Sequence, residues 1–252
     1  MTTGKKDAIL YKMFNKKIKI DGNVYHLEYL KYSWRNNMTE NKEYKLNNIN
    51  IYIKDNFKNK IDLNNVIDQL KTTLPDSMFE EIDSMYIGEF EMLINHDLNA
   101  LYKDGAIYIS NVQDNESDLL DDIIHETAHS LETKYSFLIY GDSKIEDEFI
   151  RKRVKLMKIL EEMGFKTNQA LFIDSEYSKE LDEFLYKDIG YELLNVIFSQ
   201  QGIFTSPYAA TSIREYFATG FEYYFLDERK YLKQISPALF TKIGEIHKEC
   251  TI

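Results

Sequence analysis

The spacing of apolar residues changes near Ser117, and this change limits the possible folds more than any other feature of the sequence. Before it, apolar and polar residues alternate in short runs that are typical of β-strands. These runs are residues 17–21, 24–30, 49–53, 85–93 and 106–110, with one helical pattern at residues 63–74. After it, helical spacing is expected over residues 118–137, 145–163, 178–199 and 211–227, and again from Pro237 onward. This order predicts an α+β fold with a small mixed sheet and a mainly helical C-terminal half.

Turn and loop signals divide the first half of the chain. An Asp-Gly pair at positions 21–22 predicts a β-hairpin over residues 17–30, because Asp-Gly is favoured in tight hairpin turns. The polar stretch at residues 34–46 indicates a loop or a domain boundary. We therefore expect residues 1–60 to form an N-terminal hairpin and extension, and residues 61–252 to form the main domain.

The composition argues against several classes of protein. The 252 residues include 31 Lys and Arg against 42 Asp and Glu, a formal charge of −11. This balance argues against nucleic-acid binding, because phosphate contacts need clustered basic residues. The single cysteine, Cys250, cannot form an internal disulfide, and no apolar run has the length of a membrane span. The first residues lack the apolar run of a signal peptide, so we expect a cytoplasmic protein as written, although a secreted or phage-encoded one also fits.

One motif carries recognisable chemistry. His125 and His129 enclose Glu126 in the pattern His-Glu-x-x-His, inside a strongly helical run. Residues four apart on an α-helix lie about 40° apart around its axis, so both imidazoles face one point. Two histidines bind Zn²⁺ in this way, and Glu126 then lies where it can accept a proton from water. Asp122, one turn before His125, is expected to orient its free ring nitrogen. The competing interpretation is a surface helix that carries two histidines without a metal.

A catalytic zinc site needs a third protein ligand. The short-range version of the motif places a glycine and a third histidine soon after the second one, but this chain has Glu132 and Tyr135 there. The third ligand must therefore come from another element. In the helix expected at residues 211–227, Glu215 and Glu222 share one face, and either carboxylate can reach a metal. For each of them the competing interpretation is a solvated or salt-bridged carboxylate.

These residues resemble the catalytic domain of the anthrax-lethal-factor-like metallopeptidases, a group that includes the Pro-Pro endopeptidases. The resemblance covers about residues 85–227. It rests on the His-Glu-x-x-His motif, on a Glu-aromatic-Phe-Ala sequence that begins at Glu215, and on Tyr208, seven positions earlier. The resemblance implies a zincin-like fold and one Zn²⁺ per chain. It also implies that Glu215 is the third ligand and that Tyr208 assists the transition state.

The resemblance has further implications for the surroundings of the metal. It assigns Glu222 to packing or to support of the ligands. The sequence departs from the family pattern at Thr219, where the family often has another glutamate. The interval between His129 and Glu215 is also long, which implies a helical insertion around residues 144–200.

Two features concern the substrate. A phenol such as that of Tyr208 can stabilise the oxyanion that forms during attack on a peptide carbonyl. The competing interpretation is a packing residue, because the chain has 19 tyrosines. Ile107, Tyr108 and Ile109 are expected on an edge strand, to which an extended peptide can add as a further strand. An ordinary core strand is the alternative.

The sequence therefore predicts a zinc-dependent metalloendopeptidase that acts on a peptide or protein substrate. His125, His129 and Glu215 bind the metal, and Glu126 activates water. One alternative is a catalytically silent zincin-like module that binds a partner in a toxin or phage system, and hydrolysis of a non-peptide amide is another. The intact Glu126 favours catalysis, because a structural site has no use for a general base. The other histidines are not expected to bind metal: His26, His96 and His247.

Overall fold

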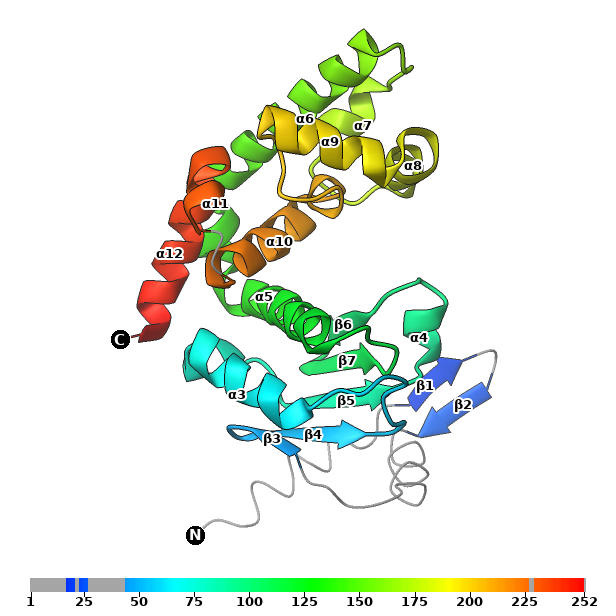
Figure 1. Cartoon of the computed structure of the whole chain (residues 1–252), viewed down its shortest axis with the longest axis vertical. Helices are drawn as coiled ribbons and strands as arrows, with labels where there is room; N and C mark the ends of the chain where they lie inside the picture. Colours follow the sequence, from blue (N-terminus) through cyan, green and yellow to red (C-terminus); the bar gives the residue numbers. More distant parts are fainter. Residues whose placement is uncertain (1–16, 21–22, 27–43, 227–228, 252) are drawn as a thin grey trace.

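A five-stranded mixed sheet forms the lower part of the molecule, and helices pack on it and extend above it (Figure 1). The strands are β3 (Tyr44–Leu46), β4 (Ile49–Ile53), β5 (Ser84–Gly88), β6 (Ala100–Lys103) and β7 (Ala106–Ser110). Their order in the sheet is β3-β4-β5-β7-β6. The inner strands β4, β5 and β7 are parallel, whereas β3 and β6 pair antiparallel at the two edges. Together with the helices, this sheet confirms the predicted α+β class.

The N-terminal region contributes a hairpin and part of the main sheet. The computed structural model describes residues 17–20, 23–26, 44–226 and 229–251. Strands β1 (Lys17–Ile20) and β2 (Asn23–His26) form a separate antiparallel sheet, which confirms the predicted hairpin. Most of the expected loop at residues 34–46 lies outside the described residues, and its last three residues form β3 instead. The main sheet thus extends across residue 60, where the sequence indicated a boundary.

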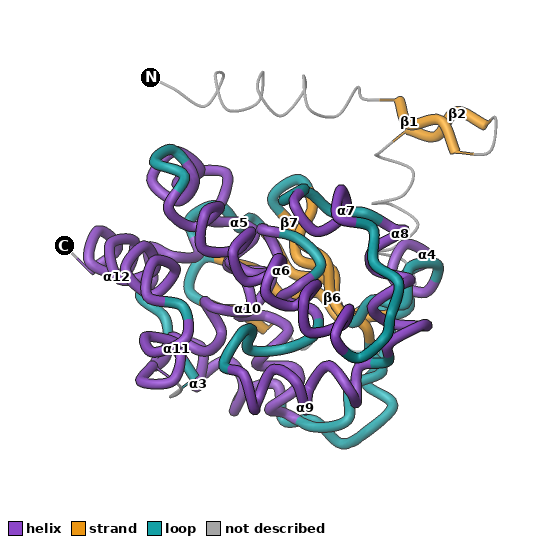
Figure 2. Tube along the Cα trace, turned by 90° about the horizontal axis from the view of Figure 1, so that it is seen from above, coloured by secondary structure: helices purple, strands orange, loops and turns teal. Residues whose placement is uncertain are grey.

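Helices dominate the chain after β7 and lie over the sheet when the molecule is seen from above (Figure 2). The α-helices are α3 (Leu63–Thr73), α4 (Glu91–Ile94), α5 (Glu116–Tyr140), α6 (Lys144–Glu162), α7 (Gln169–Ile173), α8 (Lys179–Glu183), α9 (Tyr191–Gln201), α10 (Ile213–Phe225), α11 (Arg229–Ile235) and α12 (Pro237–Thr251). The shorter helical segments are η1 (Asp76–Phe79) and η3 (Tyr208–Ala210), both 3-10 helices, and η2 (Phe184–Ile189), a π-helix. The helix expected at residues 178–199 corresponds to α8, η2 and α9, and it is interrupted at Gly190, between η2 and α9.

The two faces of the sheet differ because alternate residues of a strand point to opposite sides. On one face, Ile107 and Ile109 of β7 are fully buried and join the apolar residues of α3 and α5 in one core cluster. On the other face, Tyr52, Tyr86 and Tyr108 form a stack with ring centroids 5.3 and 5.4 Å apart. The helix that carries the His-Glu-x-x-His motif therefore packs on the buried face of the sheet.

The prediction that Ile107, Tyr108 and Ile109 lie on an edge strand is wrong. Their strand, β7, pairs with β5 on one side and with β6 on the other. Its backbone groups are therefore already hydrogen-bonded and cannot receive a peptide strand. The edge on this side is β6, which is only 4 residues long and was not recognised in the sequence. A strand added on this side of the sheet must pair with β6.

The strand expected at residues 85–93 is also shorter than predicted. β5 ends at Gly88, and Glu91 begins the short helix α4. A Cβ atom at position 88 would lie 2.9 Å from Asp55 Oδ2 and from Lys54 Cβ, so the end of β5 packs closely against the chain that follows β4. The apolar run continues beyond the strand, and periodicity cannot separate a strand from a helix in so short a segment.

Buried charged residues tie α6 to its neighbours in the helical half. Arg153 is fully buried, and its guanidinium donates to the carbonyl oxygens of Asp174 at 2.5 Å and Leu171 at 2.6 Å. Glu148, also on α6, accepts two backbone N–H bonds from the first turn of α12 at 2.9 and 3.1 Å. Such hydrogen bonds compensate for the burial of the charges and fix the positions of the segments that they join.

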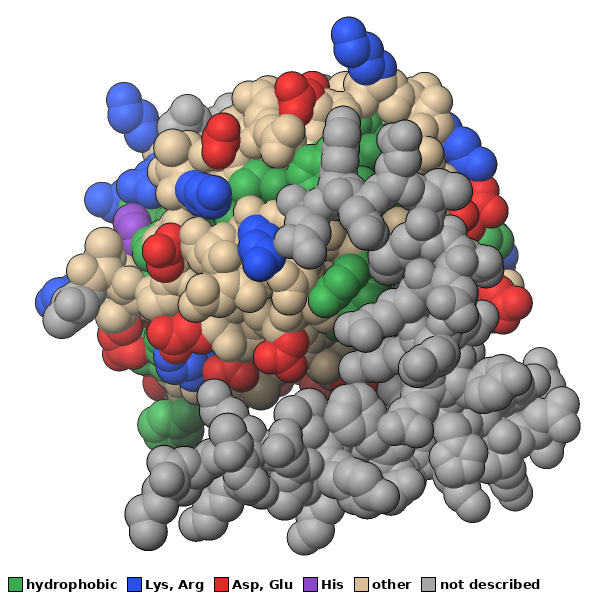
Figure 3. Space-filling model, turned by 90° about the horizontal axis from the view of Figure 1, so that it is seen from below, with side chains coloured by type: hydrophobic (Ala, Val, Ile, Leu, Met, Phe, Trp, Pro, Cys, Tyr) green, Lys and Arg blue, Asp and Glu red, His purple; other side chains and the backbone are tan. Residues whose placement is uncertain are grey.

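Two observations on the described residues concern membrane spans and surface charge. Within the described ranges, none of the helices combines the length and the apolar character needed to cross a bilayer. On the face seen from below, acidic and basic side chains of the described residues are interspersed, without a continuous basic patch (Figure 3). That face therefore offers no concentrated positive potential for phosphate groups.

Lys152 is expected to make the stability of the protein depend on pH. Its amine donates to the Ile203 carbonyl at 2.5 Å and the Ser236 hydroxyl at 2.6 Å, and burial lowers the pKa of Lys152 from 10.5 to about 7. Between these two values the unfolded chain keeps a proton that the folded chain releases, so raising the pH favours the folded state.

The test compares the parent chain with Lys152→Met by denaturant unfolding at several pH values. From pH 7 upward, the free energy of unfolding of the parent should rise relative to the variant by at most about 1.4 kcal/mol per pH unit. Parallel pH profiles for the two proteins would contradict the prediction.

Candidate metal centre

The His-Glu-x-x-His motif lies on the buried side of helix α5. Asn115 caps this helix by accepting backbone N–H bonds from Ser117 and Asp118 at 2.8 and 3.1 Å. Such a cap fixes where a helix begins. Ala128, within the motif, is fully buried, so the helix cannot rotate without exposing its apolar side. The imidazole of His125 consequently points to α10.

The helix α10 brings Glu215 to the same place. Its cap is Ser212, whose hydroxyl accepts the Glu215 N–H at 3.2 Å. A Ser-x-x-Glu sequence is typical of a capping box, in which the glutamate side chain turns back to the cap residue. Here the Glu215 carboxylate turns to the two imidazoles instead. Its position in the first turn is favourable for a negative charge, because the positive end of the helix dipole lies there.

The three donor atoms form a nearly equilateral triangle. Glu215 Oε2 lies 3.0 Å from His125 Nε2 and 3.4 Å from His129 Nε2, and the two nitrogens are 3.2 Å apart. A tetrahedral Zn²⁺ with ligand bonds of about 2.0–2.1 Å separates its ligands by roughly 3.3–3.4 Å, so the triangle fits such an ion. Among the described residues, this is the one group of His, Cys, Asp and Glu donors close enough to hold a metal. The predicted ligands are therefore brought together.

The surroundings of the two imidazoles favour positive charge. Burial alone would lower the pKa of His125, but hydrogen bonds with Glu215 and Glu222 outweigh it and raise this pKa well above 6.5. Burial is likewise outweighed at His129, where bonds with Glu132 and Glu215 raise the pKa to about 9. The positive charge that Glu215, Glu222 and Glu132 attract can come from protons on the imidazoles or from a bound cation.

Glu126 lies next to the ligands and against the edge of the sheet. Its carboxylate accepts the backbone N–H of Tyr102, on β6, at 2.5 Å, and the residue is 7% exposed. Burial raises the pKa of Glu126, although His129 and His125 act to lower it. A buried carboxylate of this kind, outside the ligand triangle but adjacent to it, is suited to accept and return a proton.

Glu222, rather than Asp122, supports His125. The Glu222 carboxylate hydrogen-bonds the Nδ1 atom of His125, which leaves Nε2 directed at the centre. Asp122 accepts instead from the Gln113 side chain at 2.9 Å, and burial raises the pKa of Asp122 to about 7. The predicted role of Asp122 is wrong, because Glu222 reaches Nδ1 from the facing helix. Thr219, between the two glutamates of α10, has a buried hydroxyl without a hydrogen-bond partner.

Glu132 supports His129 in a similar way. It follows His129 by one turn of α5, and its Oε2 atom lies 3.1 Å from His129 Nδ1. The same carboxylate accepts bonds from Arg214 at 2.8 and 2.7 Å and from the Tyr140 hydroxyl. Burial would raise the pKa of Glu132, but the bonds from His129 and Arg214 lower it. Because Arg214 directly precedes Glu215, this network also ties α5 to the first turn of α10.

The support of His129 by Glu132 and Arg214 was missed in the sequence. A usable signal existed for Glu132, because residues three apart on a helix lie close enough to interact. No comparable local signal existed for Arg214, which reaches Glu132 only after α5 and α10 have packed together.

Tyr208 lies beside the ligand group. It begins the 3-10 helix η3, its ring centroid is 5.9 Å from that of His125, and it is 39% exposed. Burial of the hydroxyl, together with the nearby Glu215 and Glu126 carboxylates, raises the pKa of Tyr208 well above 10. The phenol therefore keeps its proton and can donate a hydrogen bond. Its backbone carbonyl accepts a bond from the Thr211 hydroxyl at 2.9 Å, which holds η3 in place.

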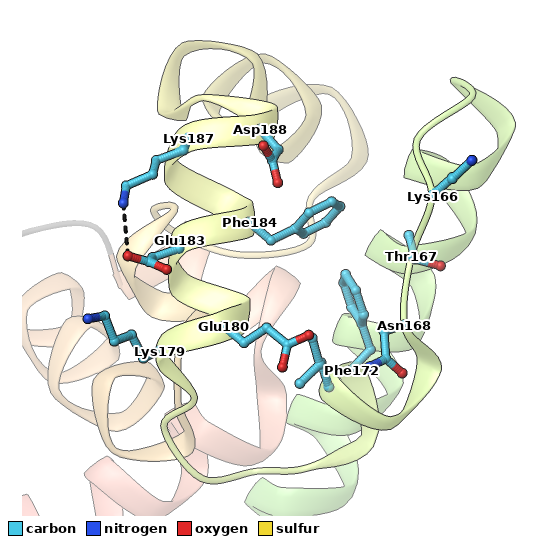
Figure 4. A pocket seen from close by; sticks show the side chains of 11 residues that line it. Lys166, Thr167, Asn168, Phe172, Lys179, Glu180, Glu183, Phe184, Lys187 and Asp188 are labelled. Atoms are coloured by element: carbon cyan, nitrogen blue, oxygen red, sulfur yellow. Dashed lines mark hydrogen bonds and ion pairs between the residues drawn. The ribbon is translucent and has the colours of Figure 1, made fainter.

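A cavity of about 590 Å³ opens beside the centre. Residues of β6, α5 and α10 line it, among them Tyr102, His129 and Arg214. This volume is within the usual range for ligand sites. A second cavity, of about 780 Å³, lies between α8 and the chain around α7 (Figure 4), and none of the predicted site residues lines it. Of these two cavities, the first adjoins the candidate metal ligands.

Among the described side chains, His96, His247 and the cysteine lie apart from this group. His247, on α12, has its Nδ1 atom 3.4 Å from the Tyr224 hydroxyl. His96 is exposed in the turn after α4. His26 ends β2, and its side chain lies outside the described part of the structure. Cys250 is buried near the end of α12.

Comparisons with known proteins identify no family for this chain. No protein-family model matches this chain, and no curated protein is similar enough to count as a relative.

Removing the charge of Glu222 is expected to weaken metal binding. Glu222→Gln should lower the affinity for zinc by about 10- to 100-fold, because the carboxylate orients His125 and increases its basicity. Competition with a zinc chelator measures this affinity. Asp122→Asn is the matched control, since Asp122 bonds Gln113, and it should have a much smaller effect. Equal losses in the two variants would contradict the assignment.

Proposed function

We propose that this chain is a zinc-dependent metalloendopeptidase with a zincin-like fold. The observation that carries the proposal is the triangle of His125, His129 and Glu215 donors, 3.0–3.4 Å apart, beside the Glu126 carboxylate. Two histidines and one carboxylate leave an open fourth position, as catalytic zinc sites require. The resemblance of the motif to the anthrax-lethal-factor-like metallopeptidases supports the same conclusion. In this proposal, α6 to α9 would form the helical insertion that the resemblance implies around residues 144–200.

Zinc held by these ligands would supply a Lewis acid that lowers the pKa of water and polarises a peptide carbonyl. The residues of the chain supply the proton transfers. Glu126 accepts the proton of the attacking water and later returns it to the leaving amine. Its bond from the Tyr102 N–H holds the carboxylate on the side that faces β6. Glu222 and Glu132 keep the two imidazoles in position throughout the reaction.

Tyr208 is the proposed oxyanion donor. Attack on the carbonyl places negative charge on its oxygen, and a protonated phenol nearby stabilises this charge more than it stabilises the neutral substrate. The raised pKa of Tyr208 keeps the hydroxyl protonated, and the fixed η3 backbone holds it beside His125.

The substrate is proposed to bind along β6. This strand is one of the two edges of the sheet among the described residues, and the N–H of Tyr102 points from it to Glu126. An extended peptide that pairs with such an edge obtains backbone hydrogen bonds, and its side chains enter pockets on either side. Tyr102 and Lys103 also line the cavity of about 590 Å³ beside His129, which gives room for a side chain.

In the proposed mechanism, Glu126 is needed for the reaction but not for the binding of zinc. Glu126→Gln should therefore retain zinc while peptide cleavage falls by about 10²- to 10⁴-fold, because the general base is lost and the ligands remain. Elemental analysis of both proteins, paired with cleavage of a peptide library, measures the two effects. A parent chain that binds zinc but cleaves nothing would favour the silent-module alternative. Cleavage that survives in Glu126→Gln would exclude the mechanism.

Tyr208→Phe is expected to lower kcat by about 10²- to 10³-fold, since one oxyanion donor is lost. KM should change little, because the hydrogen bond forms mainly in the transition state. Steady-state kinetics on a cleaved peptide gives both constants, and zinc content should stay the same. Tyr52→Phe, on the opposite face of the sheet, is the matched control and should leave both constants unchanged. A rise in KM at constant kcat would contradict the assignment of Tyr208.

A further inference from the structure

Tyrosines gather on the segment that runs from the end of α7 to the start of α9. Tyr177 and Tyr186 are 57% and 60% exposed, and Tyr191 is half-buried. The rings of Tyr186 and Tyr191 make an edge contact, with centroids 5.3 Å apart. These three residues, the tyrosine face, form an exposed aromatic surface with no role in the mechanism above.

Asp182, on α8, orders the tyrosine face. Its Oδ2 atom accepts a hydrogen bond from the Tyr177 hydroxyl at 3.0 Å. This bond restrains the ring of Tyr177, and the edge contact with Tyr186 restrains the ring of Tyr191, although solvent reaches both. A restrained aromatic surface loses little conformational entropy when it binds a partner.

The π-helix η2 directs Tyr186 away from the second cavity. Phe184, Lys187 and Asp188 of η2 line that cavity (Figure 4), whereas Tyr186 is not part of its lining and contacts Tyr191 instead. The π-helix ends at Gly190, which has a φ of +84°. π-Helical turns are rare and occur frequently at functional sites.

Backbone contacts fix the tyrosine face to the metal centre. The Ser175 carbonyl accepts the Ile213 N–H at 2.9 Å, which joins the chain just before Tyr177 to the first residue of α10. The preceding carbonyl, of Asp174, is held from the other side by the buried guanidinium of Arg153 at 2.5 Å. The segment that carries Tyr177 is thus attached to the helix that carries Glu215.

The tyrosine face adjoins the cavity beside the metal centre. Ser175 and Glu176, which directly precede Tyr177, line this cavity together with His129. Tyr208 is partly exposed beside His125. A peptide at the metal centre is therefore the occupant that lies nearest to the tyrosine face.

We propose that the tyrosine face binds a hydrophobic side chain, aliphatic or aromatic, of the peptide that is cleaved at the metal centre; this inference rests on the proposed peptidase function. Tyrosine is enriched at binding surfaces, because its ring offers a large contact area with few torsions to fix. The carboxylate of Asp182 already accepts the hydrogen bond of Tyr177, so the tyrosine face offers mainly ring surfaces. The tyrosine face therefore selects substrates at one position along the peptide.

The test is a cleavage profile of the zinc-loaded full chain on a randomised peptide library. The parent should show a preference for hydrophobic residues at one position, and Tyr186→Ala should abolish it. For the best peptide, KM should rise by about tenfold at nearly constant kcat. Tyr186→Phe keeps the ring and should keep the preference. Lys187→Ala, the adjacent residue on the side of the second cavity, is the matched control and should leave the profile unchanged.

An unchanged profile in Tyr186→Ala would overturn the proposal. A second measurement tests this proposal separately from the proposed function. Zinc-loaded Glu126→Gln is immobilised and the library peptides that it retains are identified, because binding does not require cleavage. Hydrophobic peptides retained by Glu126→Gln but not by Glu126→Gln/Tyr186→Ala would support the tyrosine face even if the parent cleaves no peptide. Equal retention by the two variants, or no retention by either, would overturn it.

Discussion

A carboxylate and two imidazoles within 3.4 Å of one another, largely shielded from water, carry several lone pairs directed at one point. Only protons or a cation can balance such a group in a medium of low polarity. Glu215 and the two histidines therefore constrain everything around them. The helices α5 and α10 must cross where these side chains meet, and the apolar residues that pack the two helices hold the charges in this arrangement.

The support of the imidazoles shows how far this constraint extends. Glu222 holds Nδ1 of His125 from one helix, while Glu132 holds Nδ1 of His129 from the other, so each ring is fixed by a separate carboxylate. Arg214 donates a hydrogen bond to Glu132, which supports His129, and it directly precedes Glu215. Glu215 and a residue that supports His129 therefore share one turn of α10. A shift of α10 would disturb both at once, which makes the geometry of the centre depend on the packing of the whole helix pair.

Local patterns were sufficient to predict the two histidines that meet at the centre, whereas the choice of Glu215 over Glu222 came from the resemblance of the motif. The spacing of His125 and His129 acts within one helical turn, and the change from alternating to helical periodicity gave the α+β class. The errors concern features that arise only from long-range pairing. Strand β7 alternates as an edge strand would, yet its neighbours in the sheet make it internal. Asp122 was a reasonable partner for His125 by spacing, but Glu222 reaches the same nitrogen from a helix 97 positions away.

The distance along the chain between the ligands has a consequence for biosynthesis. His125 and Glu215 are separated by 90 positions, with four α-helices between them. A nascent chain that has left the ribosome only as far as α9 contains the two histidines but no third donor. The donor triangle can therefore close only late, after the intervening helices have emerged and α10 has docked. Until then the two histidines are a pair of imidazoles one turn apart, so the binding of a metal by all three groups would follow completion of most of the polypeptide.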